Sequence, residues 1–304
     1  MSGIIVFDLK NKSTAALKID NAAIRKQLNS PAVRGLLMHP MLNIGVRAAR
    51  AGGNIITRYM NRLDTIKIDQ KQRNDFVSEV DRASEAEIID VLQKAFPSHA
   101  ILGEESGLTG DADAEYQWVV DPLDGTTNFL HGFPHINVSI ALKHNGKTTQ
   151  GIIYDPVSQE LFTATRGEGA SLNNKRLRVS KVTKMAGALV GYGFPNREGD
   201  DLDTHIRIVR EMMDSVTGTR RMGACALDMA YVAAGRLDGY WISGFSEWDV
   251  AAGALIVREA GGLVNDYNAG GDFVESSTLV CGNPKITHGM LQIIKPAAGQ
   301  LVTG

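Results

Sequence analysis

Two aspartates, three residues apart, follow an apolar run in the middle of the chain. Asp121 and Asp124 flank Pro122 and lead into a Gly-Thr-Thr sequence. Proline cannot donate a hydrogen bond to a sheet ladder, so we expect the strand to end near Pro122, with Asp124 in the turn that follows. Two carboxylates held this close repel each other, and a hard divalent cation bound through oxygen ligands would compensate them. The alternative interpretation is a turn that uses Asp, Gly and Thr for conformational reasons alone.

Three further acids, Asp81, Glu104 and Asp249, stand at expected turns or element ends. Asp81 lies where the helix predicted over residues 82–96 needs its N-cap, and Asp249 lies in the first turn of the helix predicted over 249–260. Each therefore also has an ordinary capping or dipole explanation. Glu104 follows a short apolar strand, where acids often form only a solvated loop. If all five acids converge, they form an oxygen-only site suited to Mg²⁺ or Mn²⁺, because no Cys/His set competes with them.

Several carboxylates that hold two or three such ions suit the hydrolysis of phosphate esters, in which a water is activated and charge on the leaving oxygen is stabilised. The hydroxyls of Thr126 and Thr127 and the backbone N–H groups of Gly125 and Thr126 offer a cradle for phosphate. A phosphoaspartate mechanism would require a D-x-D pair, which the D-x-x-D spacing does not provide.

The elements that must position these acids are mixed. Apolar periodicity predicts helices over 42–60, 82–96, 202–213, 225–234 and 249–260. The helix over 202–213 is expected to have its apolar side at residues 202, 206, 209, 212 and 213. Strands are predicted over 65–69, 100–102, 136–142, 149–154, 161–165, 177–180, 188–192, 237–242, 263–266 and 278–281. Asn145-Gly146 marks a hairpin between two of the strands. Strands outnumber a simple βαβ alternation, so we expect a mixed α/β (α+β) fold of layered sheets and helices.

Composition excludes several classes of protein. The formal net charge is −2 with Lys and Arg spread along 304 residues, so there is no direct nucleic-acid or membrane-surface signal. The two cysteines, Cys225 and Cys281, have no metal-binding spacing and are expected to be free buried thiols in the cytoplasm. We find no signal peptide and no apolar run long enough to span a bilayer.

Residues 1–37 differ from the rest, with scattered charges and little periodicity. They are either a short extra element or lie outside the native domain, which would then start at Met38; we favour the second interpretation. The domain is expected over 38–304, with a metal-binding half over about 38–185 and an α/β half over about 186–304.

Three motifs in order then resemble one family. They are Gly103-Glu104-Glu105-Ser106, Asp121-Pro122-Leu123-Asp124-Gly125-Thr126-Thr127-Asn128-Phe129, and Trp248-Asp249-Val250-Ala251-Ala252-Gly253 with Glu259-Ala260-Gly261-Gly262. The chain from Met38 onward resembles the inositol monophosphatase family, most of all its bacterial SuhB-type members. The resemblance implies an α-β-α-β-α layered sandwich of the inositol monophosphatase/fructose-1,6-bisphosphatase type, Mg²⁺-dependent hydrolysis of phosphomonoesters, lithium inhibition and a homodimer.

The resemblance also implies three sets of site residues. The first metal would be held by Glu104, Asp121 and the Leu123 carbonyl, and the second by Asp121, Asp124 and Asp249. Asp81 and Thr126 would orient or deprotonate the attacking water beside Glu104. The substrate would contact Asp124, Gly125, Thr126, Gly223, Ala224, Cys225, Asp249 and the residue at position 242.

Position 242 departs from the family pattern. Similar enzymes carry a Glu there that hydrogen-bonds inositol hydroxyls, whereas this chain has Ile242. Isoleucine cannot accept a hydrogen bond, so inositol specificity is less secure than phosphatase chemistry, unless Ser243 or Glu247 substitutes. Hydrolysis of myo-inositol 1-phosphate is the first expectation, and a sugar-bisphosphate or nucleotide 3′-phosphatase is the second. The third is an interaction protein that binds RNA polymerase or antitermination factors, because SuhB-type members are associated with transcription antitermination.

Overall fold

The computed structural model describes residues 39–60, 62–63, 66, 68–72, 75–194 and 201–298. By contacts between Cα atoms, the chain divides into Met1–Met38 and His39–Gly304. The first unit lies outside the described residues, so the expectation for residues 1–37 stays a prediction.

The larger sheet of the second unit has eight strands in the order β10-β9-β8-β7-β6-β5-β3-β4. Their bounds are β3 Ala100–Gly103, β4 Gly107–Thr109, β5 Tyr116–Asp124, β6 Asn137–His144, β7 Lys147–Asp155, β8 Glu160–Thr165, β9 Gly169–Leu172 and β10 Lys175–Arg176. All neighbours are antiparallel except β3 and β5, which are parallel. The predicted hairpin is confirmed between β6 and β7: Asn145 and Gly146 both have positive φ, at 48° and 75°, as a type I′ turn requires.

The smaller sheet has five strands in the order β12-β11-β13-β15-β14. Their bounds are β11 Leu189–Gly193, β12 Gly218–Arg220, β13 Gly239–Ser243, β14 Leu263–Asn265 and β15 Thr278–Gly282. β11 is parallel to both of its neighbours, and the pairs that involve β15 are antiparallel. A separate two-stranded ribbon pairs β1, Ile68–Gln72, with β2, Asp75–Ser78.

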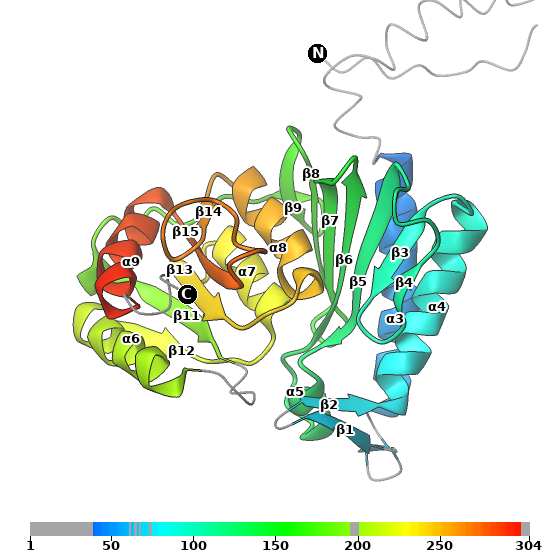
Figure 1. The fold of residues 1–304 in the computed structure, drawn as a ribbon, viewed down its shortest axis with the longest axis horizontal. Coiled ribbons are helices and arrows are strands. Elements are labelled where there is room, and N and C mark those ends of the chain that lie inside the picture. The colour runs from blue at the N-terminus through cyan, green and yellow to red at the C-terminus, as the bar shows by residue number, and fades with distance from the viewer. Residues whose placement is uncertain are drawn as a thin grey trace, which may run out of the picture. The chain divides into compact units, whose positions relative to one another are not determined.

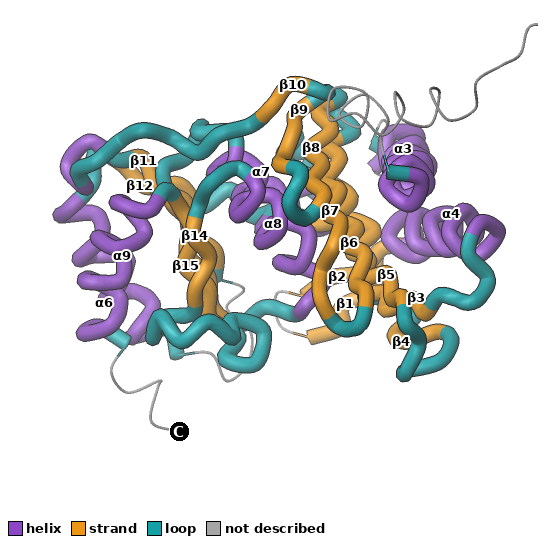
Figure 2. The backbone as a smooth tube through the Cα atoms, turned by 90° about the horizontal axis from the view of Figure 1, so that it is seen from above, coloured by secondary structure: helices purple, strands orange, loops and turns teal. Residues whose placement is uncertain are grey.

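The helices alternate with the sheets in five layers (Figures 1 and 2). The helices are α3 Pro40–Tyr59, α4 Glu79–Ala95, α5 Thr126–Leu130, α6 Leu202–Ser215, α7 Cys225–Ala233, α8 Glu247–Glu259 and α9 Pro284–Ala297. α3 and α4 cover the outer face of the large sheet, α7 and α8 lie between the two sheets, and α6 and α9 cover the outer face of the small sheet. The predicted α-β-α-β-α sandwich is therefore confirmed.

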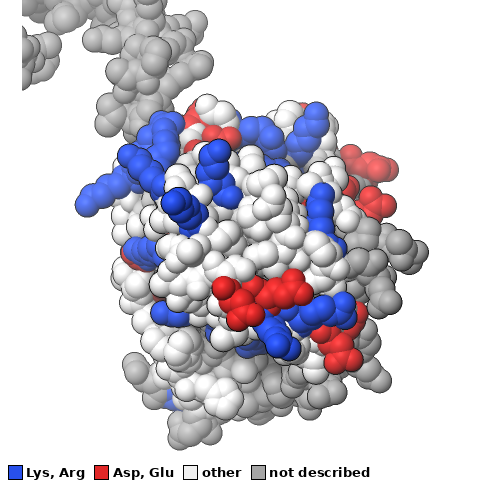
Figure 3. Space-filling view, turned by 90° about the vertical axis from the view of Figure 1, so that its left-hand side faces the viewer, with Lys and Arg blue, Asp and Glu red and all other residues white. Residues whose placement is uncertain are grey.

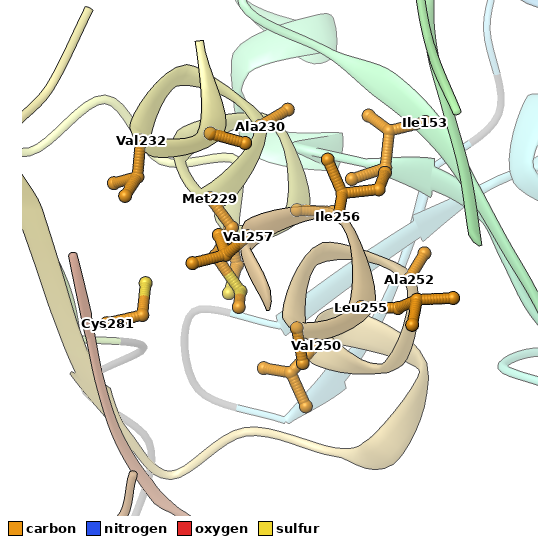
Figure 4. Close-up of a cluster of buried hydrophobic side chains, with 14 of the residues drawn as sticks. Ile153, Met229, Ala230, Val232, Val250, Ala252, Leu255, Ile256, Val257 and Cys281 are labelled. Carbon is orange, nitrogen blue, oxygen red and sulfur yellow. The ribbon is translucent and has the colours of Figure 1, made fainter. Parts of the chain in front are cut away.

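The central layer joins the two sheets through one apolar cluster. Its members come from strands of both sheets and from α7 and α8, and those labelled in Figure 4 belong to α7, α8, β7 and β15. α8 packs close to β7 at Gly151, where a Cβ would lie only 2.8 Å from the Ala252 carbonyl oxygen. The cluster buries α7 and α8 in close packing that leaves no room for water. The N-termini of these two helices are therefore held in fixed positions between the sheets.

Two predictions about elements away from the five acids need correction. Residues 177–180 do not form a strand, because the large sheet already ends at β10. On α6, only part of the predicted apolar side is buried: Met212 is buried, whereas Leu202, Ile206 and Met213 are 46%, 55% and 59% exposed. The helix instead buries the side that carries His205 and Ile208, where His205 stacks on Phe194.

Charge is mixed on the face that carries α6 and α9 (Figure 3). Lys and Arg side chains occur there beside Asp and Glu side chains, with uncharged surface between them. This agrees with a net charge near zero. Among the described helices, none has the length and apolarity that a bilayer crossing would require.

A chain that starts at Met38 is expected to unfold at the same temperature as the full chain, because the described core begins with α3. The comparison is a thermal melt of both proteins. A chain that starts at residue 46 is the matched control, since it removes the buried residues Leu42 and Gly45 and should melt lower. Loss of soluble protein on removal of residues 1–37 alone would contradict the prediction.

Candidate functional site

The end of β5 is a bulge that carries both central aspartates. Against expectation, the strand does not stop at Pro122 but continues to Asp124, which pairs with Asn137 of β6. The register shifts between Asp121 and Asp124, so Pro122 falls where no regular ladder bond is required. Leu123 N donates to Asp121 Oδ1 at 3.0 Å, and the Ser84 hydroxyl donates to the Pro122 carbonyl at 2.8 Å.

Glu104 lies next to this bulge because β3 and β5 are parallel. Gly103 is in register with Val120, and Glu104 N donates to the Val120 carbonyl at 3.1 Å. The turn after Glu104 is held by Glu85 of α4, a residue for which we predicted no role. Its carboxylate accepts from Glu105 N at 3.0 Å and from Ser106 N at 2.8 Å.

Asp81 and Asp249 occupy the same position in two different helices. The prediction that Asp81 is the N-cap of α4 was wrong. Ser78 is the N-cap, and Asp81 is the third residue of the helix. Asp81 Oδ2 accepts from Ser78 N at 2.9 Å, and Asp249 Oδ2 accepts from Ser246 N at 2.8 Å. Each carboxylate thus caps its own helix with one oxygen, and this fixes its orientation in the first turn.

Asp81 is also tied to the β5 bulge through Thr126. The Thr126 hydroxyl lies 2.9 Å from Asp81 Oδ1 and 3.2 Å from the Leu123 carbonyl. Gly125 precedes it with φ of +91°, a backbone conformation that favours glycine. Burial raises the pKa of Asp81, which makes its carboxylate a better proton acceptor.

Asp124 joins the bulge to α7, which lies between the two sheets. Its oxygens accept from Asn137 Nδ2 at 2.7 Å, Cys225 N at 3.1 Å and Ala226 N at 2.8 Å. The predicted substrate-side residues Gly223, Ala224 and Cys225 are therefore beside the aspartates. Ile242, only 6% exposed, belongs to the same apolar cluster as Cys225.

The carboxylates act on one another electrostatically. Burial raises the pKa of Asp121 well above its usual range, and the negative charges of Glu104, Asp124 and Asp249 raise it further. Burial also raises the pKa of Asp124 to about 6. The structure therefore brings four acids into one electrostatic group and connects Asp81 to it through Thr126.

This donor set fits a hard divalent cation, because it is made of oxygen atoms and carries surplus negative charge. Among the described residues, no three acids, histidines or cysteines already have the arrangement that holds an ion. The hydrogen bonds of these carboxylates give the reason: Asp124 is turned toward Asn137 and α7, and Asp81 is turned toward Ser78 and Thr126. The charge and the oxygen donors match a hard cation, while both oxygens of Asp81 and of Asp124 accept hydrogen bonds from the protein.

The contacts of three buried or half-buried polar residues near the site had no signal in the sequence. His135 Nε2 lies 2.8 Å from Asp228 Oδ1, and Asn128 Nδ2 donates to the carbonyls of Met222 and His135, each at 2.8 Å. These partners are up to 94 residues apart in the chain, so local pattern could not have connected them.

Comparison with known proteins gives consistent results. The model of the family described as "Inositol monophosphatase family" matches residues 37–297. A protein of Pseudomonas aeruginosa named "Nus factor SuhB" is 52% identical over 263 residues, which cover 85% of this chain and 97% of that protein. The crystal structure of the extragenic suppressor protein suhB from Bartonella henselae has a TM-score of 0.82 at 41% identity, covering 84% of this chain and 99% of that one. The structure of an inositol monophosphatase from Anabaena has a TM-score of 0.73 at 35% identity, covering 84% and 95%.

Proposed function

Because the chain belongs to the inositol monophosphatase family, we propose that it is a Mg²⁺-dependent phosphomonoesterase that hydrolyses myo-inositol 1-phosphate to inositol and phosphate. The observation that carries this proposal is the electrostatic grouping of Asp121 with Glu104, Asp124 and Asp249 in a buried position. Residues 38–304 would form the enzyme domain. The family also leads us to expect a cytoplasmic homodimer inhibited by lithium, with Mn²⁺ able to replace Mg²⁺.

The four acids grouped around Asp121, together with the Leu123 carbonyl, would hold the ions. Glu104, Asp121 and the Leu123 carbonyl would hold one, and Asp121, Asp124 and Asp249 the next. When bound, Mg²⁺ supplies positive charge for the phosphate oxygens and lowers the pKa of water.

The chain itself supplies orientation and a proton acceptor. Thr126 Oγ1 is hydrogen-bonded to Asp81 Oδ1, so a proton from an attacking water can pass to Asp81 through the Thr126 hydroxyl. Gly125 and Thr126 would hold the phosphate group through their backbone N–H groups. The first-turn amides of α7 keep the Asp124 carboxylate in one orientation.

Phosphate release from inositol 1-phosphate, measured with and without Mg²⁺, tests the proposal. Strong turnover that requires Mg²⁺ supports it. Weak turnover would direct the assay to sugar bisphosphates and nucleotide 3′-phosphates, the second substrate class. Absence of release from inositol 1-phosphate, sugar bisphosphates and nucleotide 3′-phosphates would contradict a phosphatase function.

Ile242→Glu tests substrate choice. If inositol phosphate is the substrate, the added carboxylate can accept a hydroxyl hydrogen bond, and we expect a lower KM for inositol 1-phosphate. Ile242→Leu is the control, because it keeps the site apolar. Position 242 is buried, so a thermal melt must show that the Glu variant is folded. An unchanged KM in a folded variant would count against hydroxyl recognition at this position.

A second function is favoured by the name of the relatives, "Nus factor SuhB". We propose that the chain also works in transcription antitermination, through contacts with RNA polymerase or its factors. A catalytically inactive Asp121→Asn protein that still supports growth of a strain lacking the native gene would favour this function. Failure to grow would favour catalysis as the main task.

A further inference from the structure

The orientation of Asp124 depends on the position of α7. Two of its three hydrogen-bond donors, Cys225 N and Ala226 N, are amides of the first turn of that helix, and they reach different oxygens of the carboxylate. Only the third donor, Asn137 Nδ2, comes from the same sheet as Asp124. A small shift of α7 would therefore leave this predicted metal ligand held by Asn137 Nδ2 alone, at one of its two oxygens.

Asn128, His135 and Asp228, which we call the clasp, fasten the start of α7 to the segment after β5. The Asn128 amide bridges the two sides, because it donates to Met222 O and to His135 O. One turn inside α7, Asp228 Oδ1 meets His135 Nε2 at 2.8 Å. The fit is close: a Cβ on Gly223 would lie 3.2 Å from Asn128 Oδ1.

The clasp is costly as a purely structural device. Asp228 is 1% exposed and His135 is 6% exposed. Asp228 Oδ2 is buried and has no hydrogen-bond partner among the described residues. A buried carboxylate with one unsatisfied oxygen destabilises a fold, and an apolar pair would pack here at lower cost. A polar pair does, however, fix the relative orientation of its two residues. Tyr231, on the next turn of α7, packs edge-on against the His135 ring, with the two ring centroids 5.5 Å apart.

We infer that the clasp is a positioning device for the proposed metal site: Asn128, His135 and Asp228 hold the first turn of α7 where its amides orient Asp124. The inference rests on the proposed function. The three residues act through α7 and Asp124, and none of them is assigned contact with substrate.

Asp228→Ala tests this with Mn²⁺ as the probe. Mn²⁺ affinity is measured by electron paramagnetic resonance of the free ion, and hydrogen exchange reports the amides of Cys225 and Ala226. We expect Mn²⁺ binding to weaken by about 10–100-fold, as for other residues that orient metal ligands. Those two amides should exchange faster, and the Mg²⁺ concentration for half-maximal activity should rise by more than kcat falls. Asp228→Asn keeps an oxygen that can accept from His135 Nε2, so its Mn²⁺ affinity should stay close to wild type.

Asp238→Ala is the matched control. Asp238 is 7% exposed and accepts from Leu189 N at 2.6 Å, so its removal also deletes a buried carboxylate that joins two elements. It should lower the unfolding temperature without changing Mn²⁺ affinity. If Asp228→Ala does not fold, Asn128→Ala provides a second test from a half-buried position, with the same expected loss of Mn²⁺ affinity.

Wild-type Mn²⁺ affinity in the folded Asp228→Ala or Asn128→Ala protein would overturn the inference, as would an equal loss in Asp238→Ala. Failure of the wild-type chain to bind Mn²⁺ would overturn it too. The proposed function fails separately, if the wild-type protein binds Mn²⁺ and hydrolyses no phosphate ester.

Discussion

Asp121→Asn is expected to lower kcat/KM for the phosphate ester by about 1000-fold and, in EDTA at pH 7, to raise the unfolding temperature. The loss of activity follows because Asp121 is the one acid that would contribute to both ion sites. Removing roughly 4 kcal/mol of transition-state stabilisation corresponds to a factor of about 1000 in rate. The gain in stability has a separate cause, the burial of Asp121 among other carboxylates.

The direction of the stability change follows from the pKa of Asp121. Its folded pKa lies well above the ordinary 3.8, so the folded state binds its proton more tightly than the unfolded state does. That contribution is fully present below about pH 4 and is lost as pH rises through the folded pKa. Wild-type stability in EDTA should therefore fall between about pH 4 and neutrality. The amide introduced by Asp121→Asn cannot ionise, so the variant should lose less, although Asp124 with a pKa of about 6 still adds a slope.

Thermal melts across this pH range, with EDTA and with Mg²⁺, measure the effect. Each kcal/mol recovered should appear as about 2–4 °C. Mg²⁺ should reverse the order of the two proteins, because an ion at 100 times its Kd stabilises the wild type by about 2.7 kcal/mol. Asp113→Asn, the same change at an exposed acid, is the control and should alter neither property. Equal melting of variant and wild type in EDTA at pH 7 would show that Asp121 is not under electrostatic strain.

The fold was predictable from the sequence where a residue pattern is compatible with only one local structure. Asn145-Gly146 has few alternatives to a hairpin turn, and it gave the correct pairing of β6 with β7. The side of α6 was not predictable in this way, because the helix carries apolar residues on more than one side. Which side is buried depends on Phe194, Trp241 and α9, whose positions are set by tertiary packing.

The acids of the site were predictable as residue types but not as structural positions. Ser78 and Asp81 are both good N-caps, and only the structure shows Ser78 in that position with Asp81 closing the capping box. Pro122 suggested the end of a strand, whereas a bulge allows the strand to continue. The roles of Glu85, His135 and Asp228, and the contacts of Asn128 within its motif, could not be predicted, because each residue acts through a partner distant in sequence.

Asp81→Asn is the second change with a large expected effect, a fall in kcat of about 10²–10⁴-fold, the usual range for removing a general base. Asp81 Oδ1 accepts from the Thr126 hydroxyl, and this is the route by which it would take a proton from the attacking water. An amide at this position is not basic. Its NH₂ group would also face a hydrogen-bond donor, either Thr126 Oγ1 or Ser78 N, since Asp81 accepts from both. Initial rates at saturating substrate and Mg²⁺ give kcat directly.

Capping and catalysis must be separated, because Asp81 serves α4 and the reaction together. Ser78→Ala removes the N-cap hydroxyl, which accepts from Val80 N at 3.1 Å and lies 2.5 Å from Asp81 Oδ2, and leaves the Asp81 carboxylate in place. We expect it to lose about 0.5–2 kcal/mol of stability with most of its kcat retained. If Ser78→Ala loses kcat as fully as Asp81→Asn, then Asp81 acts by building the helix terminus, and the proton acceptor must be sought elsewhere in the site.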